Sequence, residues 1–110
     1  MSSEKIRAGQ DKHLRLLDDL QNLLKEQLEL AHQASLGQVE LLGKQVEPLV
    51  QEVAQAKVLE QPEFKHRRMY LQRLYEELCL ALTAQQADTS RELSQVRKGK
   101  KAIGVYRNNI

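Results

Sequence analysis

The sequence is poor in the residues that turn the chain or end helices. It holds 5 glycines and 2 prolines in 110 residues, so turns are few and the elements between them must be long. Trp is absent and aromatic residues make up 4% of the chain, which leaves aliphatic side chains to build the core. Charged residues at 29% and hydrophobic residues at 41% argue against a disordered chain. We therefore expect one small helical domain.

Other residues and segments that the sequence lacks bear on the cellular compartment of the protein. The single cysteine, Cys79, excludes an internal disulfide and fits a reducing environment. No apolar run approaches the ~20 residues that a membrane-spanning helix needs. The segment from Met1 to Gln10 is polar and lacks the apolar stretch of a secretory signal. Together these features predict a cytoplasmic protein without a membrane span.

Apolar residues at helical spacing predict three long helices. The first runs from about Glu4 to Ser35, the second from about Leu36 to Val58, and the third from Pro62 onward. Short joins between long helices force antiparallel neighbours. Ser35 is the expected N-cap of the second helix. Pro48 is expected either to kink that helix or to break it.

A polar stretch from Thr83 to Ser90 makes it undecided from the sequence where the third helix ends. Either the helix continues there with a solvated face, or Asp88, Thr89 or Ser90 caps a separate helix. We therefore predict an all-α fold, an antiparallel three-helix bundle of long helices with a short fourth C-terminal helix as an open alternative.

Charge is unevenly spread along the chain. The formal net charge is +2, yet residues 91–110 hold six basic residues and one acid. A basic segment on a mildly acidic body often has its own partner or its own switching behaviour. We expect residues 1–90 to form a helical-bundle body. Residues 91–110 would be a basic regulatory segment, either part of the same domain or a mobile tail.

Candidate chemistry is sparse. Glu29–His32 and Glu63–His66 have the Glu-x-x-His spacing of di-iron bundles, but charged neighbours surround Glu29 and two arginines that repel a cation follow His66. Cys79 lies between two leucines, which is typical of a core residue. No glycine-rich phosphate loop occurs. We expect no metal, no cofactor and no enzymatic activity.

Two clusters of cations raise the question of nucleic-acid binding. They open the third helix and recur in the C-terminal segment, where they could neutralise phosphates. Acidic residues are interspersed through most of the remaining chain, and no recognition-helix arrangement stands out. We therefore expect the cations to be solvated or to contact an acidic protein, and a nucleic-acid partner is disfavoured.

The third helix carries more apolar surface than a three-helix bundle needs, which is about a third of its circumference. The additional apolar residues either pack into a tighter core, or form a dimer interface, or bind an amphipathic helix of a partner protein. The candidate partner-binding residues are Tyr70, Leu71, Leu74, Tyr75, Leu78 and Leu82.

The C-terminal stretch from Leu93 to Arg107 resembles the end of the FliT-type flagellar export chaperones. The residues that carry the resemblance are Lys98, Gly99, Lys100, Lys101, Ala102 and Tyr106. The resemblance implies a small cytoplasmic helical protein of the flagellar type III export system. Such a protein binds the helical C-terminal region of the filament-cap protein, prevents its premature assembly and delivers it to the export apparatus and its ATPase complex.

The resemblance also implies that Lys98 to Tyr106 form a movable regulatory segment. Two alternatives to a filament-cap chaperone stay open. One is a chaperone for hook–filament junction proteins, which differs mainly in its cargo. The other is a structural coiled-coil protein that forms homodimers or larger oligomers.

If the basic segment competes with cargo for the apolar band, deleting the residues after Ser90 should tighten cargo binding. A weakly packed tail and a cargo helix would occupy the same seam, so removing the tail shifts the population towards the open state. Calorimetric titration with the cargo segment measures the change. An unchanged or weaker affinity would contradict the competition.

Overall fold

The computed structural model describes the backbone of residues 2–85 and 91–104 and the side chains of residues 12–85 and 93–103. The elements in chain order are α1 (Ser2–His32), α2 (Leu36–Gln55), the 3-10 turns η1 (Val58–Glu60) and η2 (Pro62–Phe64), α3 (Lys65–Ala84) and α4 (Arg91–Gly104). No strand occurs in these ranges, and none of their helices is long and apolar enough to cross a membrane. The predicted all-α fold is confirmed, and the fourth helix that the sequence left open is present.

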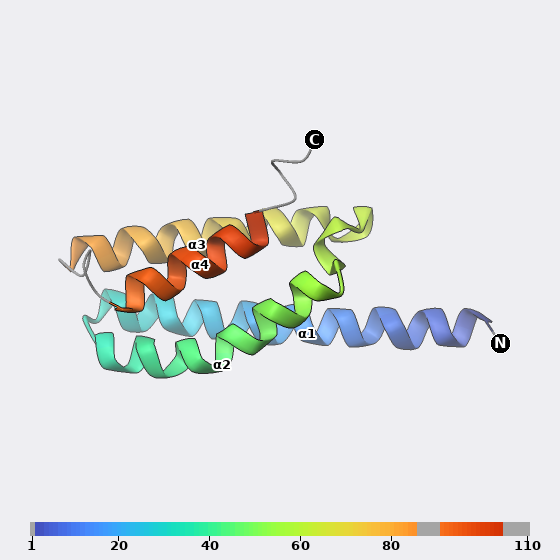
Figure 1. Ribbon diagram of the computed structural model, residues 1–110, viewed down its shortest axis with the longest axis horizontal. Coiled ribbons are helices and arrows are strands. Elements are labelled where there is room, and N and C mark those ends of the chain that lie inside the picture. The colour runs from blue at the N-terminus through green and yellow to red at the C-terminus, as the bar shows by residue number, and fades with distance from the viewer. Residues whose placement is uncertain (1, 86–90, 105–110) are drawn as a thin grey trace.

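The four helices run in alternating directions (Figure 1), and their contacts close a ring. α1 contacts α2 and α3, and α4 contacts the same two helices from the opposite side. The bundle measures 53 × 29 × 19 Å, and the N-terminal part of α1 extends beyond the other helices. The described part of the basic C-terminal segment therefore closes the bundle and does not trail from it.

Apolar side chains from every helix meet along the centre of the bundle. The apolar spacing that predicts the first helix matches its buried face at Leu17, Leu20, Leu24 and Ala31, whereas Leu14 is exposed and Leu28 is half-buried. Gln27 takes the inward position, and its Nε2 donates a 2.9 Å hydrogen bond to the Val39 carbonyl oxygen, which offsets the cost of burying an amide. Side chains that are at most 2% exposed include Leu17, Leu20, Leu24, Val39, Val53, Leu71, Tyr75, Leu78, Leu82, Leu93 and Ile103.

The join between α1 and α2 is set by backbone geometry. Ala34 adopts a left-handed conformation with φ of 59°, and the Ser35 N–H donates to the Leu30 carbonyl oxygen at 2.9 Å, which closes the end of α1. The predicted side-chain cap by Ser35 is wrong, because no such hydrogen bond forms. Ser35 has φ of −87° and ψ of 63°, outside the extended region that N-cap residues usually adopt.

The two prolines have different effects. Pro48 lies inside α2, which is continuous from Leu36 to Gln55, so the predicted alternative of a broken helix is excluded. The axis of α2 changes direction partway along (Figure 1), as expected where proline removes a backbone donor. Pro62 opens the 3-10 turn η2, one turn before α3 begins at Lys65.

Two leucines on α3 provide a matched test of this packing. The Leu78 side chain is 0% exposed and the Leu80 side chain is 70% exposed. Leu78→Ala should lower the free energy of unfolding by ~2–5 kcal/mol, because it leaves a cavity in the core. Leu80→Ala should change it by less than ~0.5 kcal/mol. Urea denaturation followed by circular dichroism measures both, and equal losses would contradict the observed orientation of α3.

Candidate functional site

The six predicted partner-binding residues lie on α3, and the structure buries five of them. Leu71, Leu74, Tyr75, Leu78 and Leu82 are each at most 6% exposed. The sixth, Tyr70, is 38% exposed, and the Lys25 ammonium of α1 lies 5.8 Å from its ring centre. The apolar band therefore faces the interior of the bundle. A partner helix can reach it only after one of the neighbouring helices has moved away.

Helix α4 covers this band together with α1. Its Leu93, Val96 and Ile103 side chains are buried, so one face of α4 packs into the bundle. The opposite face is cationic, with Arg97, Lys98 and Lys101 exposed and Lys100 half-buried. In this structure the buried part of the apolar band is thus covered by helices of the same chain, whereas Met69, Tyr70 and Leu80 of α3 remain exposed.

α4 is the shortest of the four helices and depends on its docking. It has 14 residues, a length at which an isolated helix is only marginally stable in water. Among its described side chains, three large apolar ones are buried, against five on α3. Elements with few buried contacts open at the lowest free-energy cost, and α4 has the fewest such side chains among the four helices.

A close contact between Tyr75 and Gly99 joins α3 to α4. A Cβ added to Gly99 would lie 2.5 Å from the Tyr75 hydroxyl oxygen, so glycine is needed for this approach. The Tyr75 hydroxyl is buried without a hydrogen-bond partner, which costs ~1–3 kcal/mol. Burial raises the pKa of Tyr75 above its usual value, and Cys79 adds to the shift, so the hydroxyl keeps its proton and remains a donor.

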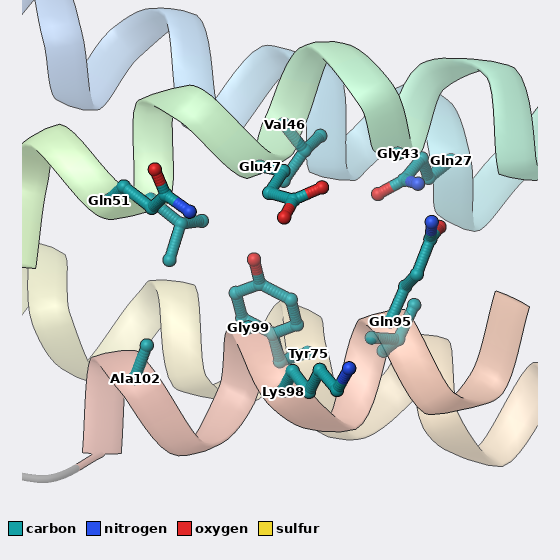
Figure 2. Close-up of a pocket in the computed structure, with 12 residues that line it drawn as sticks. Gln27, Gly43, Val46, Glu47, Gln51, Tyr75, Gln95, Lys98, Gly99 and Ala102 are labelled. Carbon is teal, nitrogen blue, oxygen red and sulfur yellow. The ribbon is translucent and has the colours of Figure 1, made fainter. Parts of the chain in front are cut away.

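A cleft of about 320 Å³ lies between α2 and α4 (Figure 2). Its apolar walls include Val46, Val50 and Val96, and the Tyr75 hydroxyl points into it from α3. The polar side chains that line it come from α1, α2 and α4: Gln27, Glu47, Gln51, Gln95 and Lys98. The cleft draws on all four helices, so no single stretch of sequence predicted it. Glycines inside helical patterns often mark close approach, and Gly43 and Gly99 both line this cleft.

The predicted regulatory residues Lys98, Gly99, Lys100 and Lys101 lie on docked α4, while Tyr106 lies outside the described residues. Cys79 of α3 is half-buried near the same helix. Burial raises the pKa of the Cys79 thiol, opposed by Lys100 and Arg97 of α4 and assisted by Glu76. The thiol therefore lies within electrostatic reach of α4.

The two Glu-x-x-His patterns lie at opposite ends of the bundle. Glu29–His32 ends α1 and Glu63–His66 spans the start of α3, and these helices run in the same direction (Figure 1). No group of three or more His, Cys, Asp or Glu side chains that could hold a metal ion occurs among the described residues. In the basic cluster of α3, Arg67 forms an ion pair with Asp18 of α1 at 2.5 Å, so this cation links two helices.

Two glycine substitutions test the contact between α3 and α4. Gly99→Ala should lower the free energy of unfolding by ~1–3 kcal/mol, because the added methyl meets the Tyr75 ring. Gly37→Ala is the control, since a Cβ there meets nothing within 4 Å and alanine favours helix by up to ~1 kcal/mol. Thermal denaturation and amide hydrogen exchange in α4 measure the effects. Combining Tyr75→Phe with Gly99→Ala should recover part of the lost free energy of unfolding. Equal changes in stability for Gly99→Ala and Gly37→Ala would rule out the contact.

Comparisons with known proteins leave the family of the chain open. No family model matches it, and no curated protein and no solved structure does either. The resemblance to FliT-type chaperones accordingly stays a prediction that rests on Lys98 to Ala102 and Tyr106.

Proposed function

We propose that this chain is a non-enzymatic chaperone of flagellar type III export. In this proposal it acts in the cytoplasm and binds the helical C-terminal region of the filament-cap protein. It keeps that region from assembling early and delivers it to the export apparatus and its ATPase complex. The observation that carries the proposal is the cover on α3, where a short amphipathic helix of the same chain lies over an extended apolar band.

The proposal requires a cargo helix to replace α4 in the ring. Leu93, Val96 and Ile103 give α4 an apolar face with helical spacing, and an amphipathic cargo helix can present the same face to a groove. Each additional large side chain that the cargo buries contributes ~1.5–3 kcal/mol. α4 has the advantage of being tethered, which raises its effective concentration, so a successful cargo must bury more apolar surface than α4 does.

The unpaired hydroxyl of Tyr75 also favours the replacement of α4 by a cargo helix. Docking α4 places Gly99 against this hydroxyl and leaves the donor without a partner. The docked state therefore bears a free-energy cost that a cargo helix with a suitably placed acceptor would avoid. A helix docked at this cost is easier to displace than one whose docking leaves every buried polar group hydrogen-bonded.

A point substitution in the full chain tests the proposal more sharply than deletion of α4, which would uncover the core. Val96 is 4% exposed, so Val96→Asp places a charge in the seam and should release α4. The apparent affinity for the cargo segment should then rise by roughly 10- to 100-fold, because the binding-competent state becomes the major one. Fluorescence anisotropy with a labelled C-terminal segment of the filament-cap protein measures this affinity.

Ser94→Asp is the matched control, since Ser94 is exposed on the same helix and gains the same charge without disturbing the seam. Its cargo affinity should equal that of the unmodified chain. Weaker cargo binding by Val96→Asp would mean that α4 belongs to the binding surface. Preferential binding of a hook–filament junction tail would change the assigned cargo, and self-association without cargo binding would favour the oligomerisation protein.

A further inference from the structure

The cleft between α2 and α4 contains a buried polar group that lacks a partner. Tyr75 is 1% exposed, its hydroxyl makes no hydrogen bond, and it points towards Glu47 and Gln51 of α2 (Figure 2). Buried polar side-chain atoms in folded proteins are nearly always paired. A molecule in the cleft that accepts or donates a hydrogen bond at this hydroxyl would satisfy it.

The size and walls of the cleft fit a small organic molecule. Its volume of about 320 Å³ lies at the lower end of the range for small-molecule sites, ~300–1,000 Å³. Val46 and Val50 of α2 face Val96 and Ala102 of α4 across it. Such sites combine apolar walls with a few polar groups that orient the ligand, and the Tyr75 hydroxyl is one such group here.

The polar lining indicates the charge and chemistry of the ligand. One acidic residue, Glu47, and one basic residue, Lys98, line the cleft, so their charges balance and favour an uncharged occupant. Three glutamines, Gln27, Gln51 and Gln95, supply the other polar groups. A carboxamide both donates and accepts hydrogen bonds, so a ligand that presents donor and acceptor together matches this lining best.

Access to the hydroxyl does not require the bundle to unfold. Glu47 and Gln51, the α2 side chains towards which it points, are both exposed. Exposed side chains exchange rotamers within picoseconds to nanoseconds. Movement of these two side chains would let a molecule in the cleft approach the hydroxyl while α4 stays docked.

We propose that this cleft binds a small uncharged molecule that carries a carboxamide on an apolar body, with the Tyr75 hydroxyl as its anchoring hydrogen-bond partner. The site is formed with α4 in place. Its lining includes Val96 of the seam, so a cargo helix that replaces α4 would remove the site. Binding of the small molecule is measured on the chain without cargo, so this proposal does not depend on the proposed chaperone function.

Three probes of similar size and different charge test the proposal: benzamide, benzoate and benzylammonium. Each is titrated into the full isotope-labelled chain, and the backbone amides of Gly43 and Gly99 report on the cleft by nuclear magnetic resonance. Benzamide should give saturable shifts at these glycines and bind more tightly than either ion. Benzoate or benzylammonium binding as tightly as benzamide would overturn the uncharged class.

Variants of two tyrosines test the anchor. Tyr75→Phe keeps the ring and removes the hydroxyl, so benzamide binding should weaken by about 3- to 10-fold, as expected for one lost hydrogen bond. Tyr70→Phe removes an exposed hydroxyl outside the cleft and should leave the affinity unchanged. Unchanged binding by Tyr75→Phe would overturn the anchor. Absence of saturable shifts up to the solubility limit of benzamide would mean that the cleft holds water only and would overturn the site.

Discussion

The approach of Tyr75 to Gly99 governs how the last helix of the chain joins the rest. The ring of Tyr75 fills the space between α3 and α4, and the missing side chain at position 99 is what admits it. The same approach leaves a hydroxyl without a partner and borders the cleft beside α2. Tyr75 thus takes part both in the tight packing of α4 at Gly99 and in the lining of the cleft.

α4 is part of the core, but among the described side chains it buries fewer large apolar ones than any of the other three helices. It completes the ring of four helices with three large buried side chains, and its Arg97, Lys98 and Lys101 side chains are exposed. The free energy of docking combines the gain from those side chains with the cost of ordering a short helix and burying an unpaired donor.

The sequence predicted the parts of the fold that depend on local spacing. Leu17, Leu20 and Leu24 lie three and four residues apart, and this period alone identifies a buried helix face. The apolar excess of α3 predicted either a tighter core, a dimer seam or a partner helix, and the structure buries Leu71, Leu78 and Leu82 of this band inside the bundle. The sequence could not decide between these alternatives, because a leucine band has the same composition under a neighbouring segment as under a partner. The cleft was not predictable, since residues as distant in sequence as Gln27 and Lys98 meet there only after the helices have paired.

Cys79 gives the bundle a built-in reporter. It is the sole thiol of the chain, it is half-buried on α3, and the charges of Lys100 and Arg97 on α4 act on it. A maleimide reagent, which is selective for thiols, therefore reacts at one position, and the charges around that thiol change when the last helix departs. The rate at which Cys79 is alkylated therefore reports how often the bundle opens, without an engineered label. The same measurement can be made in the presence of a cargo or a small ligand.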